Sequence, residues 1–251
     1  MADQIQLRGG TTAEHSTFTG AAREVTVDTD KNTLVVHDGA TAGGNPLLIE
    51  ADLKGKNLLI NGGFDVWQRG TTFSTGNEYT ADRWRTNVQN NASRVTTNIN
   101  AEAAYGLNIS NNGTAPSINQ PVELDVAGNA GVFQSGSDFV LSLTLRANVA
   151  GTIQVRGLFR DISNNSLNQV VCTNTITLNV TTGVQQFNDV LTINAAPNPT
   201  NVMMELVIFN SGGIDDFTIS QAKLEEGSVA TPFESEPYGD VLAKCQRYYE
   251  K

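Results

Sequence analysis

The sequence is poor in charge and very poor in cysteine. Charged residues make up 17% of its 251 positions, and 26 acidic against 16 basic residues leave a formal net charge of −10. This shortage of cations argues against sequence-independent nucleic-acid binding and against docking on an anionic membrane. The two cysteines, Cys172 and Cys245, form no C-x-x-C pair, which argues against a zinc site and a disulfide framework. No apolar run approaches the roughly 20 residues of a membrane-spanning helix, and the N-terminus shows no secretory signal, so we expect a soluble protein made in a cytoplasm.

Motifs of catalysis are missing as well. The sequence contains no G-x-S-x-G, no phosphate-binding glycine loop and no H-E-x-x-H. The two histidines, His15 and His37, are far in sequence from both cysteines, which leaves a Cys–His nucleophile as a formal possibility only. Two carboxylates about 5–10 Å apart would suffice for a glycosidase, but the chain lacks the length and the repeats of capsule-degrading β-helical enzymes. We therefore predict that the protein is not an enzyme, and we keep glycan degradation as a remote alternative.

The residues that are present favour β-structure. Hydrophobic residues make up 39% of the chain and there are 23 glycines, while Thr and Asn each exceed their usual share. Thr and Val fit strands, whereas Asn and Gly fit tight turns. The composition therefore predicts an all-β protein, and 251 residues are enough for two units with separate cores.

Residues 1–52 are expected to form a first unit with a thin core. Residues 24–28 and 33–37 are two strand-like runs around the turn residues 29–32, which predicts a β-hairpin. A segment this short with so few apolar residues does not fold stably alone, so we expect it to be buried against copies of itself. The residues predicted to carry this association are Ile5, Leu7, Val25, Val27, Leu34 and Val36.

Residues 57–235, after a linker at 53–56, show strand patterns separated by Asn, Gly and Ser turns. This spacing predicts an antiparallel β-sandwich or jelly roll. Residues 138–146 alternate like a strand with one buried face. Residues 201–210 are nearly all apolar, which predicts a central strand covered on both faces.

The hydrophobic period changes in residues 236–251. Apolar and aromatic residues recur there at three- and four-residue spacing, which predicts one face of a short helix with Pro237 in its first turn. Because so short a helix is not stable alone, we expect it to pack on the rest of the chain. The residues predicted for this packing are Tyr238, Leu242, Cys245, Tyr248 and Tyr249.

Several segments resemble parts of bacteriophage fibre proteins. The opening IQLRGGTTAE at residues 5–14, followed by residues 27–30 and 36–39, resembles a module at the N-terminus of trimeric phage fibres. In that module Arg is common at the position of Gly9, and Gly is common at that of His37. The resemblance implies that residues 1–52 attach or trimerise a fibre.

The larger part of the chain resembles a jelly-roll domain of phage tail proteins, which is similar to carbohydrate-binding modules. The segments that resemble its beginning and its end are residues 57–70, 79–84, 221–234 and 237–249. The resemblance implies a jelly-roll domain at residues 57–235, followed by the C-terminal helix.

Four aromatic residues are candidates for glycan contact, because sugar rings stack on aromatic faces in such binding modules. The predicted residues are Trp67, Phe73, Tyr79 and Trp84. Aromatic side chains also supply much of the burial in any core, so the alternative for Trp84 is a core residue that holds the first strands to the sandwich.

A structural calcium ion is the one cofactor that the resemblance implies. Related carbohydrate-binding modules often hold calcium between their first and last strands, and calcium takes oxygen ligands. On this chain the implied ligands are Asn61, Asp65, Asp215 and Asp216. The alternative is that Asp215 and Asp216 form a turn, because the sequence has no dense D-x-D-x-D loop.

These observations together predict a structural fibre protein of a phage virion. We expect a homotrimer on the virion exterior, assembled in the cytoplasm of the host bacterium and joined to other proteins of the tail or capsid. The jelly roll is expected to bind a host-surface polysaccharide, and the acidic chain favours a neutral glycan or one bridged by cations. The alternative is a purely architectural head fibre, spacer or adaptor that binds no glycan.

Overall fold

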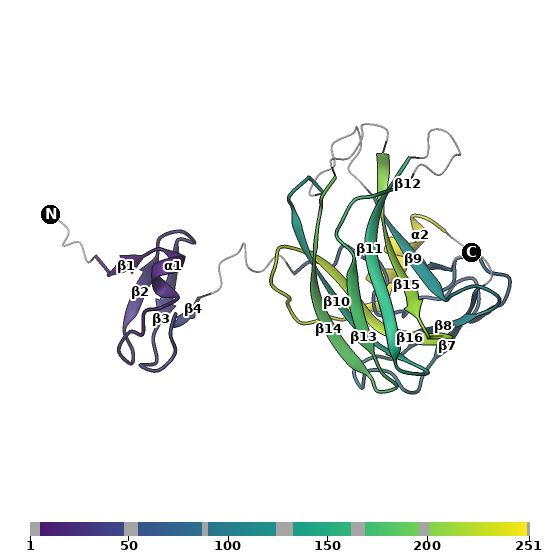
Figure 1. Ribbon diagram of the computed structural model, residues 1–251, viewed down its shortest axis with the longest axis horizontal. Coiled ribbons are helices and arrows are strands. Elements are labelled where there is room, and N and C mark those ends of the chain that lie inside the picture. The colour runs from purple at the N-terminus through teal and green to yellow at the C-terminus, as the bar shows by residue number, and fades with distance from the viewer. Residues whose placement is uncertain are drawn as a thin grey trace. The chain divides into compact units, whose positions relative to one another are not determined.

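The computed structural model describes residues 6–47, 55–86, 90–123, 133–161, 169–195 and 201–249. The chain divides into two units, Met1–Lys54 and Gly55–Lys251, and each consists of strands with one short helix (Figure 1). The all-β prediction is therefore confirmed, whereas Ile5 and residues 53–54 of the predicted linker lie outside the described ranges. Neither helix in these ranges is long and apolar enough to cross a membrane.

The N-terminal unit is a four-stranded sheet in the order β1-β2-β3-β4, with one helical turn, α1 (Thr12–His15). The predicted hairpin is confirmed, because β2 and β3 pair antiparallel from Val25 opposite Val36 to Asp28 opposite Thr33. β1 pairs with β2 in parallel, and β4 pairs with β3 antiparallel. The strands are β1 (Gly9–Gly10), β2 (Val25–Asp28), β3 (Thr33–Val36) and β4 (Asn45–Pro46).

The C-terminal unit is a jelly-roll sandwich of two antiparallel sheets. The first sheet has the order β14-β10-β16-β8-β7-β5, and the second has the order β12-β11-β15-β9-β6, with β13 also paired to β11. Strands that pair are often distant in sequence, such as β8 and β16 (Figure 1). The strands are β5 (Thr72–Phe73), β6 (Arg85–Thr86), β7 (Asn90–Val95), β8 (Gly106–Asn111), β9 (Ser117–Glu123), β10 (Asp138–Ala147), β11 (Gly151–Asp161), β12 (Gln169–Val171), β13 (Ile176–Val180), β14 (Gln185–Thr192), β15 (Asn201–Gly212) and β16 (Asp216–Glu226).

The core of the sandwich lies between the two sheets and follows the alternation of the strands. In β10, the side chains of Phe139, Leu141, Leu143 and Leu145 belong to this core and are at most 2% exposed. Full burial of a side chain of this size contributes about 1.5–3 kcal/mol. The alternation read from residues 138–146 identifies this inward face correctly. The expectation of a single buried face is wrong, because Val140, Ser142 and Thr144 on the opposite face are also at most 7% exposed.

One expectation for β15 is wrong. The strand is central in the second sheet, between β11 and β9, but it is not covered on both faces. Leu206 and Ile208 are fully buried in the core, whereas Val207 and Phe209 are only half-buried. Their face is the outside of the sandwich, where these apolar side chains lie beside long polar ones from β11.

The predicted C-terminal helix is confirmed as α2 (Tyr238–Gln246). Val241 and Cys245 are buried on one face of α2, where they pack with Val66, and Leu242 lies against the same cluster. The short helix thus gains a docking surface on the loop that precedes β5.

Candidate functional site

A cavity of about 570 Å³ lies on the sandwich where three segments that are distant in sequence come together. These are the loop around residues 63–67, the loop at 102–105, and the segment 233–238 that leads into α2. The aromatic side chains that line the cavity are Trp67, Tyr105, Phe233 and Tyr238.

Trp67 is anchored through both its ring and its indole nitrogen. Its Nε1 donates to the backbone carbonyl of Phe64, and its ring stacks on Phe73 with the two ring centroids 6.5 Å apart. Phe64 has φ of +58°, a rare conformation for a bulky residue, and its own ring packs on the buried Trp84 with centroids 5.1 Å apart. The loop that carries Trp67 is therefore pinned to the core by neighbouring aromatic rings.

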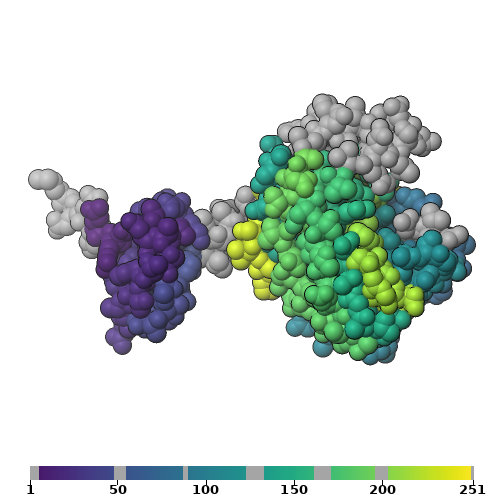
Figure 2. All heavy atoms as spheres, in the orientation of Figure 1, coloured from purple at the N-terminus to yellow at the C-terminus, as the bar shows by residue number. Residues whose placement is uncertain are grey.

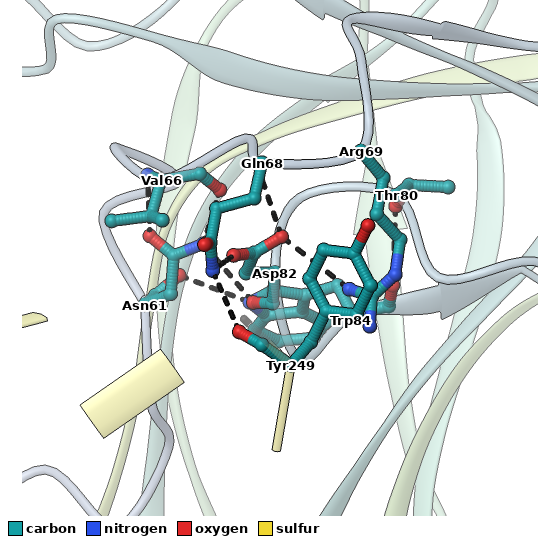
Figure 3. A network of polar contacts seen from close by, with 8 residues as sticks. All are labelled: Asn61, Val66, Gln68, Arg69, Thr80, Asp82, Trp84 and Tyr249. Carbon is teal, nitrogen blue, oxygen red and sulfur yellow. Dashed lines mark hydrogen bonds and ion pairs between the residues drawn. The ribbon is translucent and has the colours of Figure 1, made fainter. Parts of the chain in front are cut away.

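A buried polar network fixes the backbone of the same loop (Figure 3). Asn61 Oδ1 accepts from the Val66 amide at 3.0 Å, and Asn61 Nδ2 donates to the carbonyls of Val66 and Asp82, each at 3.0 Å. The Asp82 carboxylate, in a residue only 1% exposed, accepts from the Gln68 amide at 3.2 Å and from the Gln68 side chain. A satisfied network of this kind holds a binding loop in place before a ligand arrives, which reduces the entropy lost on binding.

The charged side chains of the cavity are mostly acidic. Asp65, Glu102 and Glu236 line it together with Arg94, whose guanidinium lies 4.4 Å from the centroid of the Tyr105 ring. Burial raises the pKa of Asp65 above its usual value. Aromatic faces surrounded by hydrogen-bond acceptors suit an uncharged polyhydroxyl ligand, whose rings stack and whose hydroxyls donate.

The four residues predicted for glycan contact do not share one place. Trp67 lines the cavity. Phe73 does not line it but stacks on the Trp67 ring. Tyr79, which is 36% exposed, lines a separate pocket of about 170 Å³ with Arg69 and lies 5.2 Å from that guanidinium. Trp84 has no exposed surface, and its Nε1 donates to the Asn61 carbonyl at 3.0 Å, so its glycan role is wrong and its core role is right.

The four residues of the implied calcium set are split between two places. The Gly62 carbonyl accepts from the Ala222 amide at 2.9 Å, so the loop of Asn61 and Asp65 lies near the Ala222 position of β16. Asp216 is six residues away along the same strand, which corresponds to about 20 Å. Its carboxylate accepts from Asn108, and the Asp215 carboxylate accepts from Asn111. Among the described residues, no group of three or more His, Cys, Asp or Glu side chains is placed to hold a metal ion.

Four of the residues predicted for association lie on one face of the N-terminal sheet. Val25 is opposite Val36 and Val27 is opposite Leu34, so these four side chains share a face, with Leu34 and Val36 more than a third exposed. Leu7, 43% exposed, precedes the strand β1 that extends the sheet next to β2. The opposite face, by contrast, is buried and carries polar side chains.

Two of the residues predicted for C-terminal packing meet arginines. The Arg83 guanidinium lies 3.5 Å from the centroid of the Tyr248 ring. The Arg69 guanidinium lies 3.6 Å from the centroid of the Tyr249 ring, and Figure 3 shows these two side chains together. The Tyr249 carbonyl also accepts from the Gln68 side chain at 3.1 Å. Tyr238 differs from the prediction, because it is 58% exposed at the rim of the cavity.

Sequence reasoning missed Tyr105 and Phe233 in the cavity. Both are single aromatic residues outside a strand pattern, and neither stands near Trp67 in sequence. Tyr105 and Phe233 are recognised as cavity residues only because three distant segments meet in the fold. No local sequence pattern could have identified them.

The thiols offer no nucleophile at neutral pH. Cys172 and Cys245 are both buried and unpaired. Burial raises the pKa of each thiol to about 12, which keeps both protonated.

The N-terminal unit matches proteins of known role. Residues 5–41 match the family described as major tropism determinant N-terminal domain. A tail fiber receptor-binding protein of Bordetella phage BPP-1 is 79% identical over 47 residues, which are 19% of this chain and 12% of that protein. The chain thus aligns with only a small part of this relative.

Solved structures with a similar course of the chain were also found. A cyclase from Fischerella sp. TAU has a TM-score of 0.47 at 10% identity, covering 70% of this chain and 99% of that one. A xylan-binding domain from Paenibacillus barcinonensis has a TM-score of 0.42 at 9% identity, covering 70% and 97%. The family match lies in the other unit: residues 5–41, which belong to the first unit of the chain, are similar to the major tropism determinant N-terminal domain.

Proposed function

We propose that this chain is a fibre component on the exterior of a phage virion, in which the N-terminal unit forms a homotrimer and the sandwich binds a host-surface glycan. The observation that carries this proposal is the 79% identity of a 47-residue stretch to a tail fibre receptor-binding protein. The N-terminal trimer joins the chain to other virion proteins, and the sandwich acts by binding rather than by catalysis. Three weak sites on one trimer gain avidity without any new contact.

The apolar face of the N-terminal sheet supports the homotrimer. Leu7, Leu34, Val36 and Leu47 are between 36% and 50% exposed although the unit is small. Contiguous apolar surface marks protein–protein contacts, and full burial of each such side chain contributes about 1.5–3 kcal/mol. Three copies is the number that the resemblance to phage fibre modules implies.

Leu34→Glu tests the homotrimer, because it puts a charge in the middle of the apolar face. By light scattering after size exclusion we expect the native chain to have about three times the mass of one 26.9 kDa copy. The L34E variant should have the mass of one copy, and Lys31→Glu, in the exposed turn of the same hairpin, should remain a trimer. A native chain with the mass of one copy would contradict the homotrimer.

The cavity supports glycan binding through its aromatic walls and its acidic lining. Trp67→Ala removes the anchored ring, and Phe233→Ala removes a ring from the opposite segment. On an array of neutral and amino-containing host glycans, we expect each variant to lose about 5- to 30-fold in affinity, which corresponds to about 1–2 kcal/mol for one stacked ring. Tyr79→Ala is the matched control, since it deletes an aromatic ring that does not line the cavity.

The same experiment decides between display and architecture. If the native trimer binds no host glycan and no fraction of the host envelope, the architectural alternative stands and the cavity has no ligand role. The thermal unfolding midpoint of each variant is measured alongside, so that lost binding is separated from lost folding. Release of reducing sugar from a bound glycan would contradict the non-enzymatic part of the proposal.

A further inference from the structure

A β-bulge in β16 forms part of the wall of the 570 Å³ cavity. Thr144 of β10 is opposite Gln221 of β16, whereas the next residue of β10 is opposite Ile219. Ser220 is thus an extra residue between the two pairs. A bulge of this kind changes the direction in which side chains leave a strand, and bulges are common beside functional sites. Ser220 and Gln221 both line the cavity, so the bulge places two polar side chains of a central strand there.

The side-chain amide of Gln221 is held by its oxygen and leaves its nitrogen to the cavity. Oε1 accepts from Asn100 Nδ2 at 2.8 Å and from Thr144 Oγ1 at 3.2 Å, and these two donors fix which end of the amide is the oxygen. Gln221 is only 5% exposed, and its Nε2 has no hydrogen-bond partner among the described residues. Nε2 is also not one of the unpartnered atoms that are sealed from solvent. A ligand in the cavity can therefore reach the N–H groups of this buried amide and supply the missing acceptor.

Asp65 offers an acceptor from a different segment of the same cavity. Its half-buried carboxylate has no hydrogen-bond or ion-pair partner among the described residues, and burial accounts for its raised pKa. The loop of Asp65 lies beside the bulge, because the Ala222 amide donates to the Gly62 carbonyl at 2.9 Å. A Cβ built at Gly63 would lie 2.7 Å from Asp65 Oδ2 and 3.7 Å from Phe233 Cζ, so this carboxylate is close to an aromatic ring.

The donor of Gln221 and the acceptor of Asp65 discriminate among the substituents of a sugar ring. A carboxylate could accept from Gln221, but Asp65, Glu102 and Glu236 in the same cavity would repel it. An ammonium group would suit Asp65, but it has no acceptor for Gln221 Nε2. An acetamido group is neutral and carries one N–H and one C=O, which point in opposite directions in a trans amide. It also has a methyl group that suits an aromatic wall.

We propose that the cavity selects glycans that carry an N-acetylated amino sugar. The acetamido carbonyl accepts from Gln221 Nε2, the acetamido N–H donates to the Asp65 carboxylate, and the methyl group packs on the aromatic side chains. This inference rests on the glycan-binding function proposed above and narrows its ligand to one chemical class. A site that hydrogen-bonds one substituent rejects an analogue without it, because the buried groups of the site then stay unpaired.

A matched series of trisaccharides tests this selection. N-acetylated chitotriose, its deacetylated form and cellotriose share one backbone and carry acetamido, ammonium and hydroxyl groups, respectively, at the same ring position. Each is titrated into the full chain by calorimetry at about 0.15 M salt, which screens unspecific attraction of the cationic form to the acidic chain. The methyl glycosides of N-acetylgalactosamine and galactose repeat the comparison with another ring configuration. In at least one series we expect the N-acetylated member to bind at least about tenfold more tightly than the others.

Two positions test the assigned contacts. Gln221→Glu keeps an oxygen for Asn100 and Thr144 but replaces the Nε2 donor with an acceptor, so the preference for the N-acetylated sugar should disappear. Asp65→Ala removes the acceptor without leaving a protein group unpaired, and it should weaken binding of the N-acetylated sugar at least about fivefold. It serves if Gln221→Glu lowers the thermal midpoint. Asp65→Asn keeps one acceptor oxygen and should lose less than Asp65→Ala.

Gln154→Glu is the matched control, because it makes the same substitution at a half-exposed position of β11. Gln154 does not line the cavity and belongs to the second sheet, whose strands β11, β13 and β15 lie on the side that faces the reader in Figures 1 and 2. This variant should bind every sugar within about twofold of the native chain. Equal loss in Gln154→Glu and Gln221→Glu would show that added charge accounts for the effect, which overturns the proposal.

Failure of this selection is distinct from failure of glycan binding. Trp67→Ala should weaken the N-acetylated and the hydroxyl sugar by a similar factor, since an aromatic ring stacks on either. Equal affinity of the native chain for these two sugars overturns the selection and leaves glycan binding intact. No binding of any sugar in either series also overturns the selection, and the array of host glycans then decides on glycan binding. A preference that survives both Gln221→Glu and Asp65→Ala overturns the assigned contacts.

Discussion

At the residue scale, a buried row of polar side chains lies at the centre of the N-terminal unit. His15 Nε2 lies 2.8 Å from the Thr26 hydroxyl oxygen, and His37 Nε2 lies 2.9 Å from the same atom. His15 Nδ1 faces the Thr11 carbonyl at 2.9 Å, so Nδ1 carries the proton and Nε2 accepts from Thr26. Since that uses the hydroxyl proton, His37 Nε2 donates to Thr26, and its Nδ1 accepts from the Gly20 amide at 3.3 Å.

This geometry predicts opposite tautomers for the two neutral histidines. We expect the Nδ1–H form of His15 and the Nε2–H form of His37, read from the nitrogen-15 shifts of the imidazole rings by NMR. Thr26→Val keeps the shape but removes the shared hydroxyl, and it should lower the free energy of unfolding by about 1–3 kcal/mol because the two ring nitrogens lose their partner. Identical tautomers in the native chain would contradict this hydrogen-bond order.

The sequence identifies both histidines but not their shared partner. Thr26 meets them only in the folded unit, where its hydroxyl on β2 lies within hydrogen-bond distance of His15 on α1 and of His37, which follows β3. Gly20 is needed for a related reason, since a Cβ there would lie 2.5 Å from the His37 ring. Trp84 is a second case that the sequence does not decide. Its two alternatives, glycan contact and a place in the core, differ only in burial, and burial depends on the whole sandwich.

At the scale of single elements, long strands with a clear pattern are predictable from sequence and short ones are not. The alternation in residues 138–146 identifies β10 and its inward face. β5 and β6 each have only two residues, so they exist through pairing with β7 and β9 rather than through propensity. The apolar run of β15 is recognised as a central strand, but its outer face is misjudged because apolar residues also lie on outer faces.

The capping box of α1 predicts a pH dependence of the N-terminal unit. Glu14 accepts from the Thr11 amide at 2.7 Å, and this hydrogen bond is the main reason that the pKa of Glu14 lies below its usual value of 4.5. A lowered pKa in the folded state means that the stabilisation is complete above about pH 4.5 and is lost as the pH falls further. The thermal midpoint of the unit should therefore drop as the pH falls below about 4.5.

Glu14→Gln is the variant that checks this origin. Glutamine can still complete the capping box but does not titrate. The variant should lose less stability than the native chain over the same pH range. A residual loss remains expected, because hydrogen bonds from Thr41 and Ala40 also lower the pKa of Asp38. An unchanged pH profile in E14Q would show that Glu14 is not responsible.

At the scale of the whole molecule, the division into two units is visible in the sequence, whereas the cavity is not. The thin core and the turn-rich end of residues 1–52 indicate a separate front unit. The cavity instead needs the loop at 63–67, the loop at 102–105 and the segment 233–238, which meet only through the order of strands in the sheets. That order is set by long-range pairing and has no local signature.

The two units predict two unfolding transitions with different dependence on protein concentration. The N-terminal transition should shift upward as the concentration rises, because association of copies stabilises only the folded unit. The sandwich has its own core, so its transition should stay in place. Scanning calorimetry of the native chain at two concentrations, with Leu34→Glu as reference, measures both. A single transition that does not move with concentration would contradict this division.

The outward-facing apolar side of the N-terminal sheet bears on how the proposed fibre would be synthesised. The small unit leaves the ribosome before the sandwich, and translation of the roughly 200 residues of the second unit takes about 10–40 s at 5–20 residues per second. During that time the apolar faces of nascent chains on one messenger RNA are closer to one another than to any other copy. In the proposed homotrimer, chains therefore come together from neighbouring ribosomes on one messenger RNA. When two phages infect one cell, trimers that mix chains of both should form less often than random association of the chains would give.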